Sequence, residues 1–395
     1  MKTDLIKNPD SYLNYFKANT GLLSAMGNKF PDPTNFRSVI ALYDKAIEKD
    51  SAFAMAFAKR AIALSWGIHA GEIEAANCEK CLSDIEIASK IDPSLPEVDM
   101  AWGFYYYYCK KDYQNAFDNF NTASQKDLKN YEPKFYMAMV QRILGKWEEV
   151  SILLKTVENL EPGNPLVLTN IGLSYDYMHD YDSALNYHQK AIDVKPDWPA
   201  AYLNKIGSLC LKNGNTSDAH STLDFVTRNF PEKQEELRII LDMYDRNYEG
   251  ALTKAANASP SDFNITGARL MYLANISALL GKNEEAYHYY DLLLKDLNQQ
   301  LNCYPDNAYI HSFLGLANAG KGNAEEAIFQ GETALKIVSD RNYLLMSDMR
   351  INLAQIYTRL GMFDKAREII TYYLNNPSLL SDKMLQLDPV WEPLK

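Results

Sequence analysis

The sequence lacks long apolar runs and basic runs. No segment approaches the roughly 18 consecutive apolar residues that a membrane-spanning helix needs, and residues 1–10 have no apolar core like that of a signal peptide. Asp and Glu number 51 against 40 Lys and Arg, which gives a net charge of −11. Because no basic stretch offsets this charge, a nucleic-acid partner is not expected. These absences predict a cytoplasmic protein that binds neither nucleic acid nor a membrane.

Motifs that assemble catalytic sites are also missing. The chain has no P-loop, no HExxH, no GxSxG and no dinucleotide-binding fingerprint after a strand. Its six histidines never pair at positions i and i+4, and His188 is interpreted as a packed histidine with a satisfied ring nitrogen. We therefore expect no enzymatic activity, no metal site and no cofactor.

Cysteine is scarce. Five cysteines, odd in number and scattered, do not suggest a disulfide framework and favour a reducing compartment. Cys78 and Cys81 form a CxxC, but a zinc site needs two more ligands at fixed spacing. A redox pair uses a helix N-terminus, whereas both residues are expected within the body of a helix over residues 74–91. We interpret them as ordinary packing residues.

What the chain does contain is an internal repeat. A small residue, a bulky residue four positions later and a small or medium residue three after that recur ten times. The copies are Val39-Tyr43-Ala46, Cys81-Ile85-Ala88, Ala116-Phe120-Ala123, Val150-Leu154-Val157, Ala184-His188-Ala191, Ala219-Leu223-Val226, Ala251-Ala255-Ala258, Ala286-Tyr290-Leu293, Ala327-Gly331-Ala334 and Ala366-Ile370-Tyr373. Their first members lie 42, 35, 34, 34, 35, 32, 35, 41 and 39 residues apart. A period near 34 with helical internal spacing is typical of stacked helix pairs.

The unit around Ala184 illustrates the pattern. A first helix is expected over residues 165–178, with Gly172 as the small position that lets the second helix approach. The second helix is expected over about residues 182–194. Proline stops it, because proline cannot donate the next backbone hydrogen bond. The prolines expected to close second helices are Pro93, Pro162, Pro196 and Pro231.

These units resemble the tetratricopeptide repeat (TPR) family, with the small step of the first helix seen in Ile171-Gly172 and Leu314-Gly315. The resemblance implies an all-α, right-handed superhelical solenoid of about ten antiparallel helix pairs. Residues 1–34 would supply the first helix and entry loop, 35–375 the solenoid, and 376–395 a C-terminal cap. Two features depart from the pattern: the unit around Ala251 is short, and extra residues lie near 297–305 and 338–345.

The C-terminal end carries a weaker resemblance. Its sequence LQLDPVWEPLK is similar to tails that close the repeat regions of bacterial multidomain signalling proteins, in which a kinase, adenylate cyclase or regulator domain is attached. The simpler interpretation is a capping segment in which Trp391 covers the apolar face of the last helix pair.

In the TPR family the concave wall is made mainly by the first helix of each pair, and the resemblance implies that ligands bind there. The run 104–108 must place some aromatic rings outside the core, because a helix turns through all faces in four residues. Alternatively, the tyrosines simply fill gaps between helix pairs. The wall residues so mapped are Phe104, Tyr107, Tyr108, Phe135, Met139, Arg142, Thr169, Leu173, Tyr177, Asn204 and Lys212.

Two functional hypotheses follow. The first is a non-catalytic scaffold that binds a peptide or protein segment in the concave groove. The second is a sensing region of a bacterial signalling protein that binds a small molecule or a partner, with its effector domain absent from this chain. The oligomeric state is left open.

Overall fold

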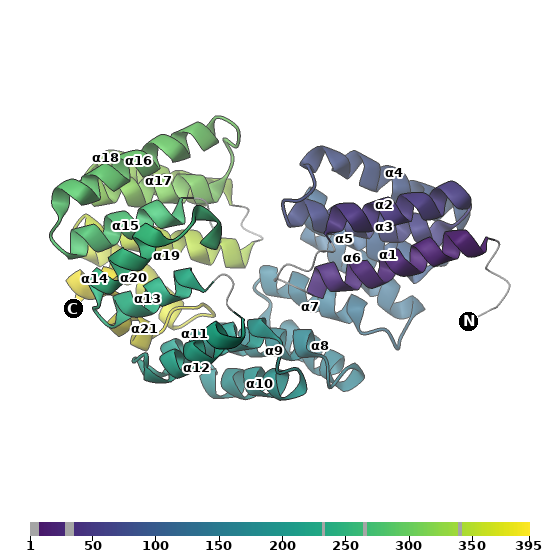
Figure 1. The fold of residues 1–395 in the computed structure, drawn as a ribbon, viewed down its shortest axis with the longest axis horizontal. Helices are drawn as coiled ribbons and strands as arrows, with labels where there is room; N and C mark the ends of the chain where they lie inside the picture. Colours follow the sequence, from purple (N-terminus) through teal and green to yellow (C-terminus); the bar gives the residue numbers. More distant parts are fainter. Residues whose placement is uncertain (1–7, 28–34, 231–233, 264–266, 339–341) are drawn as a thin grey trace. The chain divides into compact units, whose positions relative to one another are not determined.

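The computed structural model describes residues 8–27, 35–230, 234–263, 267–338 and 342–395 (Figure 1). These residues form helices joined by turns, and no described helix is both long and apolar enough to cross a membrane. The chain divides into two compact units, Met1–Val167 and Leu168–Lys395. Each unit is a stack of helix pairs.

Helices of two kinds, A and B, alternate along the chain. The A helices are α1 (Pro9–Gly27), α3 (Ala54–His69), α5 (Pro96–Phe104), α7 (Glu132–Ile143), α9 (Pro165–Tyr177), α11 (Pro199–Asn213), α13 (Glu235–Tyr244), α15 (Ala268–Leu279), α17 (Ala308–Lys321) and α19 (Tyr343–Arg359). The B helices are α2 (Phe36–Lys49), α4 (Cys78–Ile91), α6 (Tyr113–Lys126), α8 (Trp147–Leu160), α10 (Tyr181–Val194), α12 (Ser217–Asn229), α14 (Tyr248–Asn257), α16 (Asn283–Leu301), α18 (Ala324–Ile337) and α20 (Phe363–Leu374). The B helices pack on neighbouring A helices, as α2 does between α1 and α3 and α18 does between α17 and α19. The predicted all-α solenoid of antiparallel pairs is confirmed.

The ten sequence triplets are the packed faces of the B helices. Every member is buried, from Val39, Tyr43 and Ala46 on α2 to Tyr373 on α20. The small members let the neighbouring A helices approach, and the bulky member fills the space between them. His188, in a bulky position, is fully buried and its Nε2 lies 3.1 Å from Asp176 Oδ2, so its prediction as a packed histidine is confirmed.

Close approach at the small position of the A helix is equally clear. A Cβ added to Gly172 would lie 2.4 Å from the imidazole Cε1 of His188, and one added to Gly103 would lie 2.4 Å from Phe120. Real Cβ atoms do not reach such distances, so these two glycines are required by packing. The predicted role of Gly172 is confirmed.

Each described A–B turn contains one residue in the left-handed conformation. These residues are Gly71, Lys111, Gly145, His179, Gly214, Arg246, Gly281, Gly322 and Gly361. Glycine suits this position because it has no Cβ to clash, so the three other residues depart from the pattern.

The units expected to be irregular are so. Around Ala251, α13 and α14 have only ten residues each, whereas α16 extends to 19 and α19 to 17. Pro93, Pro162 and Pro196 each follow the C-cap residue of a B helix, and Pro231 lies outside the described residues.

The tyrosine run does not continue α5 as an α-helix. Residues Tyr105–Lys110 form a π-helical turn, η3, which changes the direction of successive side chains. Tyr105 and Tyr108 are buried while Tyr106 and Tyr107 are half-buried. Some of the aromatic rings therefore lie partly outside the core, as the sequence predicted. They do so on a π-helical turn, which is wider than the α-helix that was expected.

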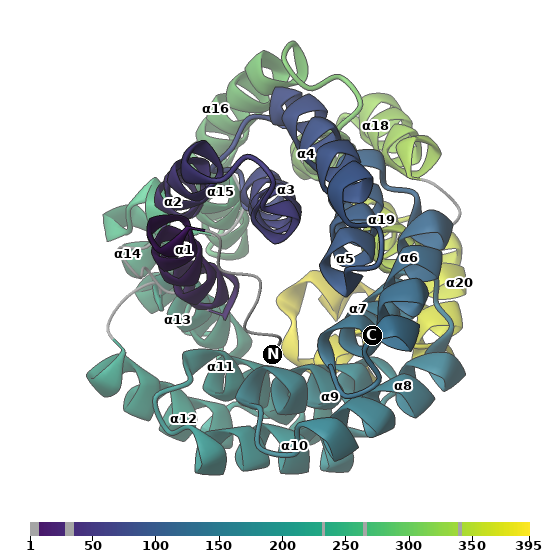
Figure 2. The same ribbon diagram turned by 90° about the vertical axis from the view of Figure 1, so that its right-hand side faces the viewer.

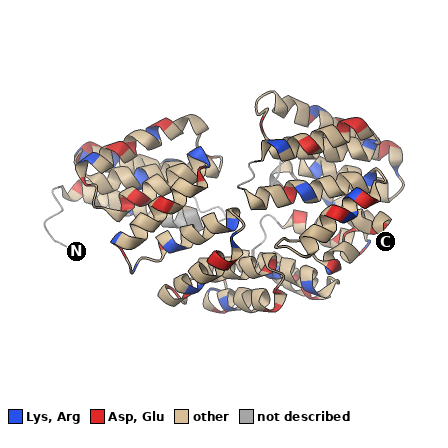
Figure 3. Cartoon of the chain, turned by 180° about the vertical axis from the view of Figure 1, so that it is seen from behind, with Lys and Arg blue, Asp and Glu red and all other residues tan. Residues whose placement is uncertain are grey.

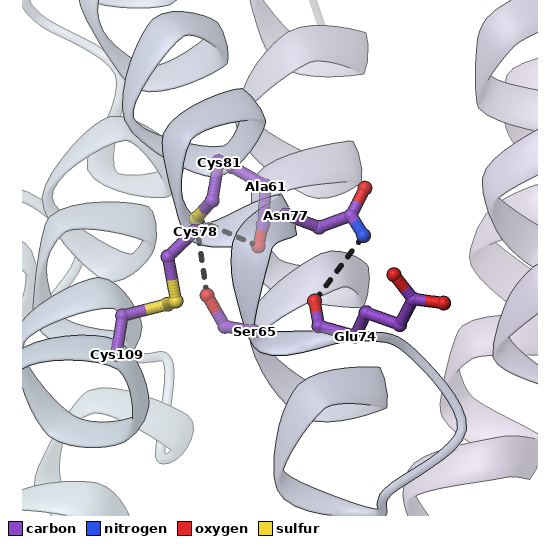
Figure 4. Close-up of a disulfide and its surroundings, with 7 residues drawn as sticks. All are labelled: Ala61, Ser65, Glu74, Asn77, Cys78, Cys81 and Cys109. Atoms are coloured by element: carbon purple, nitrogen blue, oxygen red, sulfur yellow. Dashed lines mark hydrogen bonds between the residues drawn. A yellow bond between two sulfur atoms is a disulfide. The ribbon is translucent and has the colours of Figure 1, made fainter.

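The prediction that Cys78 is an ordinary packing residue is wrong. Cys78 and Cys109 form a disulfide, with their Cα atoms 5.9 Å apart (Figure 4). Cys78 is the first residue of α4 and not part of the helix body, and the stacking of the repeats brings the end of η3 beside it. Cys81 is a packing residue as predicted: it is fully buried, and its Sγ lies 3.2 Å from the Ser65 hydroxyl.

Candidate functional site

The second unit holds the chain's own C-terminal end against its A helices. After α20 the chain forms α21 (Asp382–Leu387) and the 3-10 helix η5 (Pro389–Leu394). Here α21 packs on α11, and η5 packs on α19. Figure 2 shows this yellow end of the ribbon on the side of α11 that faces away from α12. We refer to residues 376–395 as the C-terminal segment.

The first contacts of the segment are made at the end of α9. The backbone N–H of Ser378 donates to the carbonyl of Tyr177 at 2.8 Å, and His179 Nε2 donates to the carbonyl of Ser378 at 3.1 Å. Burial lowers the pKa of His179, while its bond to the Ser378 carbonyl opposes that shift. Both hydrogen bonds are made to the backbone of the segment.

The next contact lies at the end of α11. The hydroxyl of Ser381 donates to the carbonyl of Leu211 at 2.7 Å and accepts from the backbone N–H of Met384 at 3.0 Å. It therefore caps α21 and at the same time satisfies a carbonyl in the last turn of α11, which has no partner within its own helix. The segment thus bonds to backbone carbonyls at the ends of α9 and α11.

Arg246 makes the third set of contacts, from the turn after α13. Its guanidinium donates to the carbonyls of Gln386 and Leu387 and pairs with Glu392, with Nη2 2.7 Å from Oε1. Because an arginine has five N–H donors in a rigid fork, one side chain serves all three acceptors.

The two A–B turns of this unit that have a residue other than glycine in the left-handed position both contact the segment through that residue. His179 and Arg246 occupy the left-handed position at φ 61° and 62°. That conformation costs a residue with a Cβ about 1 kcal/mol or more. Both side chains bond to the C-terminal segment, whereas Gly214, in the turn between them, lets Lys383 and Gln386 approach its backbone. We call the set Tyr177, His179, Leu211, Gly214 and Arg246 the segment-binding surface.

Apolar contacts complete the attachment. Leu387 is buried against Ile206 and Cys210 of α11 and Leu241 of α13. Farther on, Trp391 is 2% exposed and packs with Ala354, Ile370 and Tyr373 of the last helix pair. The segment therefore covers the last pair and also reaches back to α9, α11 and α13.

A cavity of about 440 Å³ remains between η5 and the helices α13, α15, α16, α17 and α19. Its polar lining includes Asn275, Tyr290, Gln355, Arg359 and Asp388. Arg359 donates to the Tyr290 hydroxyl at 3.2 Å, which in turn donates to Asn275 Oδ1 at 2.8 Å. Burial raises the pKa of Asp388, while the backbone N–H of Val390 and the guanidinium groups of Arg359 and Arg246 oppose the shift.

A serine, a histidine and an aspartate also meet in the second unit, but in its interior. Asp176 Oδ2 accepts from the Ser208 hydroxyl at 2.8 Å and lies 3.1 Å from His188 Nε2. All three residues are at most 2% exposed, so no substrate reaches them. The group links α9, α10 and α11 as a buried polar network.

In the first unit the predicted wall residues are mostly packed inside. Phe104, Tyr108, Phe135 and Met139 are buried, and Tyr107 and Arg142 are half-buried. The rings of Phe104 and Tyr108 contact Trp66, at centroid distances of 6.2 and 5.1 Å. These contacts favour the interpretation of the tyrosines as residues that fill gaps between helix pairs. Their role in binding stays a prediction.

In the second unit the predicted wall residues lie on α9 and α11. Thr169 is buried, Leu173, Tyr177 and Asn204 are half-buried, and Lys212 is exposed and pairs with Asp182. Tyr177 accepts a bond from the segment through its carbonyl, and Lys212 follows Leu211, which does the same. The roles of His179, Arg246 and the segment itself were not predicted from the sequence, although non-glycine residues at turn positions where other repeats have glycine were a detectable signal.

Figure 3 shows acidic and basic residues mixed along the helices on the side that it displays. Among the described residues, no group of three or more His, Cys, Asp or Glu side chains is placed to hold a metal ion.

No model of a known protein family matches the sequence, and a comparison with curated proteins finds no match either. Among solved structures, the APC/C hetero-tetramer Cut9–Hcn1 matches over 90% of this chain and 57% of that one, at 16% identity and a TM-score of 0.51. TTC0263, a thermophilic TPR protein of Thermus thermophilus, matches over 51% of this chain and all of its own, at 16% identity and a TM-score of 0.42. YrrB, a TPR protein with an unusual peptide-binding site, matches over 48% of this chain and 92% of its own, at 21% identity and a TM-score of 0.34. From its paired A and B helices and the match over nine-tenths of its length, this chain has the fold of a TPR-like solenoid.

Proposed function

We propose that this protein is a non-catalytic interaction scaffold whose A helices bind a peptide segment of another protein. The observation that carries the proposal is that the second unit already binds a peptide, namely residues 378–392 of its own chain. Backbone groups of Ser378, Gln386 and Leu387 form hydrogen bonds with the segment-binding surface, and the Leu387 side chain fills an apolar site. Recognition through backbone bonds and a few anchoring side chains is how proteins bind extended or partly helical peptides.

The proposed contact residues include the wall residues expected from the sequence. In the second unit these are Leu173, Tyr177, Asn204 and Lys212, with Thr169 beneath them. In the first unit Tyr107 and Arg142 are the half-buried candidates, and Phe104, Tyr108, Phe135 and Met139 would shape the wall from within. Aromatic and arginine side chains dominate binding energy at protein interfaces, which favours this set.

The proposal is tested by selecting a random peptide library on the full chain, in its wild-type form and as Leu387→Ala. That substitution weakens the hold of the C-terminal segment, so it exposes the surface beneath. Peptides recovered from either form should lose at least tenfold in affinity for Asn204→Ala/Lys212→Ala or for Arg246→Ala. They should keep it for Lys336→Ala, a change on the exposed side of α18.

Two results would contradict the proposal. One is that neither form selects any peptide above the background of an unrelated helical protein. The other is that selected peptides bind all variants equally, which would place their contacts outside the A helices. Circular dichroism of each variant shows whether a lost affinity reflects lost fold.

A further inference from the structure

We infer that residues 381–388 are an internal occupant of the segment-binding surface and that the external partner is a peptide of the same chemistry that displaces them. The inference rests on the proposed function and adds to it the kind of partner and a barrier to its binding.

The flanks of α21 are anchored in the apolar cluster of the last helix pair, whereas α21 itself is held by polar bonds and by few buried side chains. Before α21, Leu380 is 3% exposed, and after it Trp391 is 2% exposed, both within one apolar cluster of the last helix pair. Between these anchors, α21 has six residues and buries only Leu387. Asp382, Lys383 and Gln386 are exposed. The loop 381–388 can therefore leave the surface while Trp391 keeps capping the last pair.

Tethering explains how so short a helix stays in place. A segment joined at both ends to its binding site has an effective concentration in the millimolar range, so a few bonds hold it without high intrinsic affinity. A free peptide with the same contacts must compete with that concentration. The bound residues 381–388 thus lower the apparent affinity of the surface for any external peptide.

The surface specifies the chemistry of such a partner. The carbonyl of Leu211 accepts a hydrogen bond, which the Ser381 hydroxyl donates here. The Leu387 site takes an aliphatic side chain six residues after that serine, and Arg246 donates to two backbone carbonyls. The fitting partner is a peptide with a serine-capped helical turn and a leucine six residues after the serine, whose backbone carbonyls near that leucine face Arg246.

Binding of a fluorescein-labelled synthetic peptide with the sequence of residues 378–392, followed by fluorescence anisotropy, tests the inference on the full chain. The Kd should fall at least tenfold from wild type to Ser381→Ala/Leu387→Ala, because the loosened loop no longer competes. Adding Arg246→Ala to that variant should reverse the gain. Leu379→Ala, an exposed position of the same segment outside α21, is the matched control and should leave the Kd within twofold of wild type.

Two other outcomes distinguish the claim that residues 381–388 block the surface from the claim about the partner's chemistry. Equal affinity in wild type and the loosened variant, still sensitive to Arg246→Ala, would overturn the internal occupant while leaving peptide binding in place. No binding by the loosened variant, with its circular dichroism unchanged, would overturn the partner chemistry inferred here. The library selection would then decide the proposed function on its own.

Discussion

Arg246 and Glu392 form an ion pair, with Nη2 2.7 Å from Oε1, that joins the turn after α13 to the last residues of the chain. The same guanidinium donates to the carbonyls of Gln386 and Leu387. Arg246 therefore contacts the C-terminal segment on both sides of Asp388, and it does so from a turn position at which most other repeats have glycine.

Arg246→Gly should free the segment without disturbing the turn, because glycine adopts the left-handed conformation at no steric cost. Bonds to a charged group contribute about 1.5–3 kcal/mol, and the relief of the turn offsets about 1 kcal/mol of that. Hydrogen exchange at residues 382–388 should become at least tenfold faster, with little change in α15 and α16. Arg228→Ala, exposed on α12, should leave both regions as they are. Unchanged exchange at residues 382–388 would show that Arg246 does not hold the segment.

Glycines 172 and 207 should respond to alanine in opposite directions. At Gly172 the new Cβ would lie 2.4 Å from His188 Cε1, so Gly172→Ala should destabilise the protein by about 1–3 kcal/mol, the usual cost of overpacking. Gly207 is exposed within α11 and has nothing within 4 Å of its added Cβ. There alanine should stabilise by about 0.5–1 kcal/mol through its helix propensity. Urea unfolding measures both, and a change of the same sign would contradict the packing argument.

The disulfide predicts a redox-dependent stability of the first unit. Cys78 and Cys109 close a loop with a sequence separation of 31, and a cross-link of about that span stabilises a fold by roughly 3–4 kcal/mol in the chain-entropy view. Cys78→Ser/Cys109→Ser should therefore lower the unfolding temperature and abolish its response to dithiothreitol. Cys303→Ser, an exposed free cysteine, is the control. A wild-type unfolding temperature that ignores dithiothreitol would show that the bond contributes nothing.

Asp348 predicts a pH dependence in the last repeats. Burial raises its pKa from 3.8 to about 6, while the hydrogen bond from Tyr309 opposes the shift. Because the folded state holds this proton more tightly than the unfolded state does, stability should fall as the pH rises from about 4 to about 6 and then level off. A tenfold change in proton affinity corresponds to about 1.4 kcal/mol, so the loss is about 1–3 kcal/mol.

Asp348→Asn should remove that slope and raise the free energy of unfolding at pH 7, since the amide oxygen still accepts from Tyr309. Asp364→Asn, fully exposed on α20, should change neither. Urea unfolding between pH 4 and pH 7 gives the comparison. A slope that persists in Asp348→Asn would assign the pH dependence to another group.

The helix pairs could be predicted from the sequence because their signal is local. The Ala184-His188-Ala191 pattern reports one packed face at helical spacing, and the burial of all three residues shows that tertiary packing used that face as expected. The length of α10 follows from the same pattern and the proline after it.

The segment-binding surface could not be predicted in this way, because it depends on residues far apart in sequence. Nothing near Ser381 indicates that its hydroxyl bonds to Leu211, and nothing near Cys78 indicates pairing with Cys109. Both contacts arise from how the repeats stack. The faces of the tyrosine run could not be predicted for a different reason. Their prediction assumed a regular α-helix, whereas residues Tyr105–Lys110 form a π-helical turn.

A reversible disulfide lock on α21 tests whether the C-terminal segment occupies a peptide-binding surface. A Cβ added to Gly214 would lie 3.4 Å from the Cβ of Lys383, which suits a disulfide, so Gly214→Cys/Lys383→Cys should cross-link on oxidation. Gly214→Cys alone controls for the strain of a side chain in the left-handed turn, and wild type controls for reduction of the native disulfide.

The measurement is the Kd of the labelled 378–392 peptide for this variant before and after reduction, with the cross-link verified by mass spectrometry. We expect at least tenfold weaker binding in the oxidised form, and recovery on reduction that neither control shows. Equal binding by the cross-linked and reduced forms would contradict this expectation.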